Sequence, residues 1–333
     1  MDHRVVSTRL STRGWIRPRS SPGSVDAMST ALELRSLTKT YPAADGGVMT
    51  AVDTLDLTIE SGEVVAFLGP NGAGKSTTID MILGLIPPDA GTVTVFGGTP
   101  GDAVAQGRVA AVQQSGGLLP TLTVQDTVDL VAALHPGADP DAVIVRAGID
   151  SIRTRQVGKC SGGQQQALRF ALALLAEPDL LILDEPTAGM DVDARRRFWA
   201  SVRADAGRGS TVLFATHYLE EADQFADRVV MIARGAIVAD GPTAEVRAVA
   251  TGRQLSAVVG SDGASALLAA VPGVRVAEVR GARTVFAADA EASDEALRFL
   301  LTRTDARDVE ATTHGLEDAF VALTTNLTKE NAR

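Results

Sequence analysis

The feature that most constrains this chain is a glycine-rich segment between a buried strand and a helix. The apolar run Val64–Leu68 has the composition of a strand covered on both faces, and Gly69–Ser76 follows at once with the sequence GPNGAGKS. This matches G-x-x-x-x-G-K-[ST] in the strand-to-helix context that gives the pattern its meaning. Glycines let backbone N–H groups converge on one point, and the helix that begins near Gly74 adds the positive end of its dipole. The segment predicts a nucleoside-triphosphate site.

The side chains of this segment have separate roles in that interpretation. Lys75 supplies a mobile positive charge for the β- and γ-phosphates, and the hydroxyl of Ser76 can ligate Mg²⁺. The alternative is a plain strand-to-helix turn, in which glycine is common but the Lys-Ser pair is not required. The predicted nucleotide-binding residues of the loop are Gly69, Pro70, Asn71, Gly72, Ala73, Gly74, Lys75, Ser76 and Thr77.

Length and composition exclude several other classes of protein. With 333 residues and 45% hydrophobic side chains, the chain has room for about two globular domains. No apolar stretch approaches the ~18 residues needed to span a bilayer. A single cysteine excludes an internal disulfide. A net charge of −10 with 4% aromatic residues argues against a nucleic-acid-binding surface, which needs basic grooves and stacking rings.

Three further segments narrow the class of nucleotide-binding protein. Cys160–Gln166 reads CSGGQQQ, Leu180–Thr187 reads LLILDEPT, and Ala215–His217 reads ATH. In this order and spacing, over about residues 31–245, the chain resembles the nucleotide-binding subunit of an ATP-binding cassette (ABC) transporter. The combination of motifs carries the resemblance, because the phosphate loop alone also occurs in kinases, GTPases and motor ATPases.

The resemblance implies an α/β fold of the P-loop NTPase class, in which a mixed, mostly parallel core sheet carries an antiparallel β layer and a helical subdomain. Apolar strands that alternate with helices favour such a sheet independently, because both of its faces must be covered. We expect the cassette over 31–246 and the helical subdomain over about 115–160. Within the cassette we expect antiparallel strands over 31–40 and 49–60 and a further hairpin over 91–98.

The resemblance also assigns roles at the strand ends. Asp184 would hold Mg²⁺ through a water molecule, together with Ser76, and Glu185 would act as the general base that activates the attacking water. His217 would contact the γ-phosphate and orient Glu185. Gln114 would sense Mg²⁺ and the water, although the register leaves Gln113 open. The alternatives are a strand-end cap for Asp184, a surface glutamate for Glu185 and a structural histidine for His217.

Residues on three other segments complete the predicted site. Tyr41 occupies the position of a ring that stacks on adenine, with simple packing beside Pro42 as the alternative. In the family, the signature residues cap the γ-phosphate bound to a second copy of the chain, and Asp191 links the two sites across that interface. Cys160 stands where leucine is usual and is expected to be a small buried hydrophobe, with a redox switch as the alternative. The predicted signature residues are Ser161, Gly162, Gly163 and Gln164.

Both ends of the chain differ from the cassette in composition. Residues 1–30 carry five arginines against two aspartates, without an apolar segment, so they do not form a secretory signal. We expect a basic, disordered leader, or a start site assigned too early with Met28 as the initiator; the alternatives are an organelle transit peptide and a segment that contacts anionic lipids. Residues 250–333 predict a small α+β accessory domain that ends in the segment Leu316–Phe320 (LEDAF), which is similar to the C-terminal extension of ABC-2-type exporters.

The sequence therefore predicts a Mg²⁺-dependent ATPase that binds ATP between two identical copies and powers export. Its expected partner is a separately encoded integral-membrane permease, which would hold it on the cytoplasmic face of the membrane, and no nucleic acid is expected. The alternatives are the ATPase of an ABC importer and a soluble ABC ATPase without a transport role. The transported compound is not encoded in these residues.

Overall fold

A six-stranded sheet in the order β5-β6-β7-β3-β8-β9 organises the computed structural model, which describes residues 29–43, 46–113, 116–248, 253–289, 291–313, 316 and 320. Neighbouring strands run parallel except β8 and β9, which pair antiparallel. Every residue of β3 and β7 is buried, which explains their unbroken apolar sequences. The strands are β3 (Val64–Leu68), β5 (Val109–Val112), β6 (Leu180–Asp184), β7 (Thr211–Thr216), β8 (Arg228–Ala233) and β9 (Ala236–Pro242).

A second, antiparallel sheet packs beside the first. It consists of β1 (Thr30–Pro42), β2 (Val48–Glu60) and β4 (Ala90–Val95) in the order β2-β1-β4. The predicted antiparallel strands are confirmed, but the hairpin predicted over 91–98 is wrong. β4 is a single strand that pairs with β1, and the chain after it only turns back far enough for one bridge between Val95 and Gly98.

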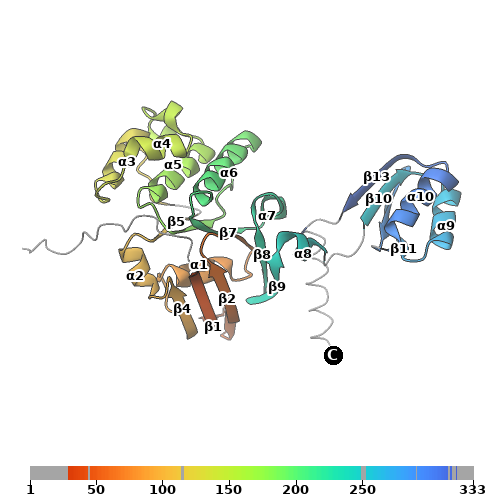
Figure 1. Cartoon of the computed structure of the whole chain (residues 1–333), viewed down its shortest axis with the longest axis horizontal. Coiled ribbons are helices and arrows are strands. Elements are labelled where there is room, and N and C mark those ends of the chain that lie inside the picture. Colours follow the sequence, from red (N-terminus) through yellow and green to blue (C-terminus); the bar gives the residue numbers. More distant parts are fainter. Residues whose placement is uncertain are drawn as a thin grey trace, which may run out of the picture.

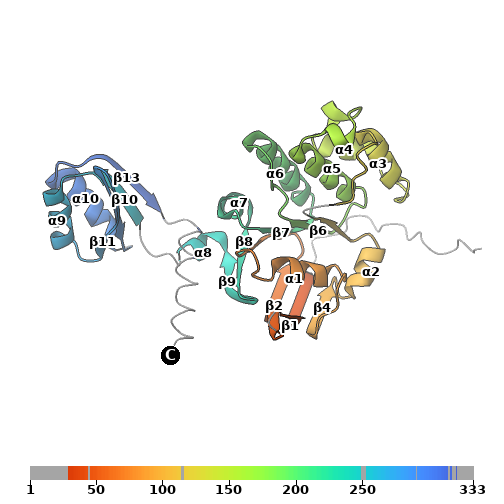
Figure 2. The ribbon, with the colours of Figure 1, turned by 180° about the vertical axis from the view of Figure 1, so that it is seen from behind.

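Helices cover both faces of the six-stranded sheet (Figure 1). One face carries α3 (Val124–Ala132), α4 (Pro140–Arg146), α5 (Gly162–Leu174) and α6 (Val192–Ala206), with short 3₁₀ turns at Asp150–Ile152 and Val157–Lys159. The other face carries α1 (Lys75–Ile82), α2 (Pro100–Ala105) and the antiparallel sheet (Figure 2). Each face has its own apolar core, so the predicted mixed α/β architecture is confirmed.

Aromatic side chains fill much of the core under α5 and α6. Phe170 contacts Phe198 edge to face at 5.2 Å between ring centroids, and Trp199 contacts Phe214 at 4.6 Å. Phe225 stacks on Trp199 at 4.8 Å, with 10° between the ring planes. Phe225 ends α7 (Leu219–Phe225), so this cluster fixes α6, β7 and α7 against one another.

Residues 253–313 form a separate β-α-β-β-α-β unit with its own core. Its strands are all antiparallel in the order β11-β12-β10-β13, and α9 and α10 pack on the sheet (Figure 1). The last strand, β13, was not predicted. The elements, preceded by α8 (Thr243–Ala248), are β10 (Arg253–Val258), α9 (Ser261–Ala270), β11 (Val274–Arg280), β12 (Arg283–Ala288), α10 (Ser293–Arg303) and β13 (Arg307–Thr313).

Two residues beyond this unit pack elsewhere. Leu316 is 2% exposed and Phe320 is partly buried, and both belong to the core of the cassette rather than to that of the small unit. The chain therefore returns to the cassette after β13. Within the described ranges, no helix is both long enough and apolar enough to cross a membrane.

Candidate functional site

The phosphate loop joins the end of β3 to α1 and depends on two close backbone approaches. A Cβ atom on Gly69 would lie 2.4 Å from the carbonyl oxygen of Ile232, and one on Gly74 would lie 2.2 Å from that of Ala51. Gly74 also has φ of 106° and serves as the N-cap of α1. Only glycine combines this conformation with this approach. The loop is consequently held between β2 and β8 at the N-terminus of α1, where the first N–H groups of a helix have no partner within the helix and can bind an anion.

Lys75 lies at the start of α1 and is 6% exposed. Its Nζ donates a hydrogen bond to the carbonyl of Gly69 at 2.6 Å and a longer one to that of Pro70 at 3.3 Å, so the side chain folds back over the loop. Burial lowers the pKa of Lys75, while the nearby carboxylates of Glu185 and Asp184 oppose that shift. The cation is thus held inside the loop and faces the two carboxylates.

Ser76 and Asp184 meet across the sheet edge. The Ser76 hydroxyl donates to Asp184 Oδ2 at 3.0 Å, and Asp184 Oδ1 is buried with no hydrogen-bond donor among the described residues. Burial raises the pKa of Asp184, the Ser76 hydrogen bond opposes that shift, and the charge of Glu185 adds to it. A carboxylate oxygen left without a donor beside a hydroxyl matches the oxygen ligands of a hard cation, so these two residues fit Mg²⁺.

Glu185 and His217 form the neighbouring pair. His217 Nδ1 lies 2.8 Å from Glu185 Oε2, and this oxygen accepts no hydrogen bond from the described residues. Glu185 is 9% exposed and has φ of 48°, the left-handed region that is strained for a residue with a side chain. Its N–H donates to the carbonyl of Ala215 on β7 at 2.9 Å. The pair stands next to Asp184 and Lys75, so the structure brings these four predicted residues together. Their roles as general base and orienting histidine stay predictions.

Tyr41 lies near the end of β1 and is half-buried beside its cross-strand partner Met49. Lys39 Nζ lies 5.8 Å from the Tyr41 ring centroid and forms an ion pair with Asp89 at 2.8 Å. Asp89 also accepts hydrogen bonds from the N–H and the hydroxyl of Thr40, at 2.7 and 2.8 Å. The ion pair and hydrogen bonds of Asp89 therefore hold the end of β1 that carries the Tyr41 ring. The contact of this ring with adenine stays a prediction.

The signature residues form the N-terminus of α5. Ser161 caps this helix, because its side chain accepts from the N–H of Gln164 while the Gln164 side chain accepts from the N–H of Ser161 at 3.0 Å. The side chain of Asp191 caps α6 by accepting a single hydrogen bond from the N–H of Ala194 at 2.7 Å. A Cβ on Gly163 would lie 3.3 Å from the Met190 side chain, so the two helix starts lie side by side. Figure 2 shows α5 and α1 on opposite sides of β6 and β7.

One predicted residue cannot be placed. Gln114 lies outside the described residues, so the choice between Gln113 and Gln114 stays open. Gln113 is exposed and lines a groove of about 460 Å³ between α2, β5, α5 and the segment that follows α1. The wall of this groove is largely apolar, and Arg169 of α5 bridges it by donating to the carbonyl of Gly116 at 3.1 Å.

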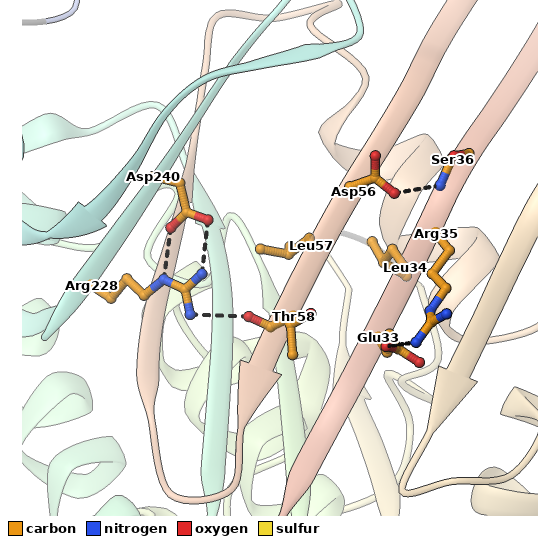
Figure 3. Close-up of a pocket in the computed structure, with 9 residues that line it drawn as sticks. All are labelled: Glu33, Leu34, Arg35, Ser36, Asp56, Leu57, Thr58, Arg228 and Asp240. Carbon is orange, nitrogen blue, oxygen red and sulfur yellow. Dashed lines mark hydrogen bonds and ion pairs between the residues drawn. The ribbon is translucent and has the colours of Figure 1, made fainter.

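A second hollow, of about 550 Å³, lies between β1, β2 and the start of β8 (Figure 3). Arg228 forms two hydrogen bonds to Asp240, at 2.7 and 2.8 Å, and Ser36 N–H donates to Asp56 at 2.7 Å. None of the predicted site residues lines it, and these charged groups are occupied with one another. We therefore exclude this hollow from the candidate site.

Glu221 is a buried carboxylate that the sequence did not single out. Glu221 of α7 is 3% exposed and contacts Thr187, Arg195 and Thr216. In the sequence it stands in the acidic run Leu219–Asp223, which reads as a solvated helix face. The sequence offered one signal that Glu221 lies near the site. It follows His217 by four residues, about one helical turn beyond the end of β7.

Comparison with known proteins decides the family. Residues 52–188 match the model of the family described as ABC transporter. The chain is 34% identical to the Nod factor export ATP-binding protein I of Paraburkholderia xenovorans (strain LB400), over 88% of this chain and 97% of that protein. The chain is an ATP-binding subunit of the ABC transporter family. Membership makes this subunit an ATP-hydrolysing enzyme.

Further relatives agree with this assignment. The subunit is 38% identical to the daunorubicin/doxorubicin resistance ATP-binding protein DrrA of Streptomyces peucetius, over 65% of this chain and 67% of that protein. A solved ATP-binding subunit of an ABC transporter has a TM-score of 0.58 and 26% identity, covering 66% of this chain and 92% of that one. A dimeric ATP-binding cassette bound to ADP and Pi has a TM-score of 0.57 and 25% identity, covering 63% of this chain and 98% of that one. The ABC cassette fold is thereby confirmed.

Proposed function

We propose that this ABC ATP-binding subunit powers the export of a substrate through a separately encoded membrane permease. The observation that supports export most directly is the similarity over nearly the full chain to a Nod factor export ATP-binding protein. A drug-resistance ATP-binding protein among the relatives points the same way. The permease would hold the subunit on the cytoplasmic face of the membrane.

The catalytic proposal uses the residues that meet at the strand ends. Lys75 turns from the carbonyl of Gly69 to the phosphates, since a phosphate oxygen is the stronger acceptor for its charge. Ser76 and Asp184 would hold Mg²⁺, which would supply positive charge to the phosphates. Glu185 accepts a proton from the attacking water, and His217 orients Glu185 from 2.8 Å. Tyr41 stacks on the adenine, and the glutamine at 113 or 114 contacts the water.

The signature helix supports a dimeric arrangement. Ser161 and Gly163 are at the N-terminus of α5, and α5 lies on the other side of the sheet from α1, the helix that follows the phosphate loop of the same chain (Figure 2). We propose that they cap the γ-phosphate bound to a second copy, and that Asp191 lies at the same interface. ATP then stabilises the closed pair because it binds that state better than the open one.

The groove beside Gln113 supports a site for the permease. Leu85, Val104 and Arg169 line it, and Leu85 is 60% exposed and Val104 43% exposed. An apolar helix end of the permease with an acidic residue would bury these side chains and pair with Arg169. A movement of the permease at this groove would be transmitted through α1 to the phosphate loop and through α5 to the signature residues.

Glu185→Gln tests the catalytic assignment. The variant keeps the shape of the side chain but cannot accept a proton, so ATP binding should persist while turnover falls by about 10²-fold or more. Size-exclusion chromatography with ATP should then show a stable dimer that dissociates when ATP is removed. Near-normal turnover in this variant would refute the role of Glu185, and a strictly monomeric variant would refute the dimer.

The permease proposal is tested by co-purification. A tagged chain should isolate a polytopic membrane protein, and Val104→Glu together with Leu85→Glu should abolish this association while ATP hydrolysis by the isolated subunit remains. If the variant with both glutamates still isolates the membrane protein, the groove is not the site where the permease binds. Recovery of ribosomes or DNA instead would favour a role outside transport.

A further inference from the structure

Glu221 is a buried acid that the reaction described above does not use. It lies in the first turn of α7 with 3% of its surface exposed, whereas its neighbour Glu220 is exposed. Burial raises the pKa of Glu221, and the hydroxyl of Thr187 and the charge of Arg195 oppose that shift. A buried carboxylate without partners is strongly disfavoured, so what this one contacts determines what it does.

Its partners come from three segments, each next to a proposed catalytic or interface residue. Thr187, which donates its hydroxyl hydrogen to Glu221 Oε1, follows Glu185 by two residues. Thr216 directly precedes His217, and its hydroxyl lies 3.4 Å from Glu221 Oε2 while accepting from the N–H of Tyr218 at 3.0 Å.

The third partner is on α6. Arg195 Nε lies 3.2 Å from Glu221 Oε1, and the Arg195 guanidinium lies 5.2 Å from the Tyr218 ring centroid. The backbone N–H of Arg195 donates to the carbonyl of Asp191 at 3.0 Å. The ion pair thus fixes the helical turn that Asp191 caps.

The backbone at Glu185 needs such support. A non-glycine residue at φ of 48° persists only where its surroundings hold it. The N–H of Glu185 is held by Ala215 and the N–H of Ala188 by Glu185, while the side chain of Thr187 between them is held by Glu221. Loss of the Glu221 contact would let this loop relax and carry the Glu185 carboxylate away from His217.

We propose that Glu221 is a positioning residue for ATP hydrolysis. From one buried point it holds the loop after Glu185, the strand end that carries His217 and the helix start that carries Asp191. It acts through the three segments that it joins. This inference rests on the roles proposed above for Glu185 and His217.

The test measures kcat and KM for ATP in the purified full chain, with rates expressed per nucleotide-binding site. Glu221→Ala should lower kcat by about 10²-fold, because displacement of a catalytic group by about 1 Å has effects of that size. KM for ATP should change by less than about threefold, because Lys75 is held by the carbonyls of Gly69 and Pro70, within the phosphate loop itself. Glu221→Gln keeps an acceptor for Thr187 but loses the charge for Arg195, so kcat should fall by about tenfold.

Asp205→Asn is the matched control. Asp205 is also a buried acid, 2% exposed, and it pairs with Arg146 and Arg208 at 2.6 Å each, at the opposite end of α6. This variant should lose thermal stability as the Glu221 variants do, yet keep kcat within about twofold of the wild type, since a structural loss remote from the site leaves the chemistry of the folded molecules intact.

A second variant keeps the proposal testable if Glu221→Ala does not fold. Thr187→Val removes one hydroxyl and leaves Glu221 in place, so it should lower kcat by about tenfold with KM unchanged. The proposal is overturned if Glu221→Gln and Thr187→Val both keep wild-type kcat, or if Asp205→Asn loses as much activity. Glu185→Gln in the same assay separates the two assignments: if Glu185→Gln is inactive and the Glu221 variants are active, only the positioning role fails.

Discussion

Gly74 offers the sharpest test of how the phosphate loop is built. Gly74→Ala would place a Cβ 2.2 Å from the carbonyl oxygen of Ala51, whereas such contacts are essentially never closer than 3.0 Å. The start of α1 must therefore move away from β2 by about 0.8 Å. Strain at φ of 106° costs about 1–3 kcal/mol, and the forced movement adds about 1–3 kcal/mol.

This movement affects binding as well as stability. The displaced N–H groups and Lys75 would miss the phosphates by nearly 1 Å, so affinity for a fluorescent ATP analogue should fall by about 10²-fold. Gly62→Ala is the matched control, because Gly62 has φ of 86° with no atom within 4 Å of its Cβ. It should lose about 1–3 kcal/mol in denaturant unfolding through backbone strain alone and keep its ATP affinity. If Gly74→Ala binds ATP within threefold of the wild type and unfolds no more easily than Gly62→Ala, the geometric argument is refuted.

Three further predictions concern stability and chemistry outside the loop. Phe170→Ala removes a fully buried ring and should destabilise the protein by about 3–5 kcal/mol, as measured by denaturant unfolding; a loss below 1 kcal/mol would contradict the packing described for α5. Burial raises the pKa of the Cys160 thiol, so peroxide should inhibit the wild type no more than Cys160→Ala in an ATPase assay, and selective inhibition of the wild type would revive a redox role. The Lys39 ion pair and the Thr40 hydrogen bonds lower the pKa of Asp89 from 3.8 to about 2. Asp89 therefore stabilises the fold above pH 3.8 and loses that effect as the pH falls towards 2, so the difference in Tm between wild type and Asp89→Asn should shrink over this range; a constant difference would count against it.

Much of the cassette could be predicted because its local sequence patterns are each typical of a single local structure. The apolar run of β3 followed by GPNGAGKS predicts a strand, a phosphate-binding loop and a helix, and the structure has all three in this order. Ser161 and Gln164 form a capping box at the start of α5, and the S-x-x-Q spacing of such a box is present in the local sequence. At these positions the local backbone preference and the tertiary packing agree.

The errors lie where distant partners decide the structure. The stretch Gly91–Gly98 has glycines at both ends and alternating residues between, which is typical of a hairpin, but its partner is β1, more than fifty residues earlier. β13 is a short and polar segment that becomes a strand because it pairs with β10. Glu221 looks like a surface acid until α7 turns it towards Thr187 and Arg195. Such pairings depend on which segments meet in space, and local sequence does not encode them.

The first and last strands of the C-terminal unit are neighbours, and Arg253 is paired with Thr313. The polypeptide therefore enters and leaves this unit at almost the same point, and Leu316 is already back in the cassette core. For the cassette, these roughly sixty residues are topologically equivalent to one long surface loop. The entropic cost of closing such a loop grows only slowly with its length. Evolution could exchange or enlarge such an appendage without rebuilding the nucleotide site, which makes this the natural place for related subunits to diverge.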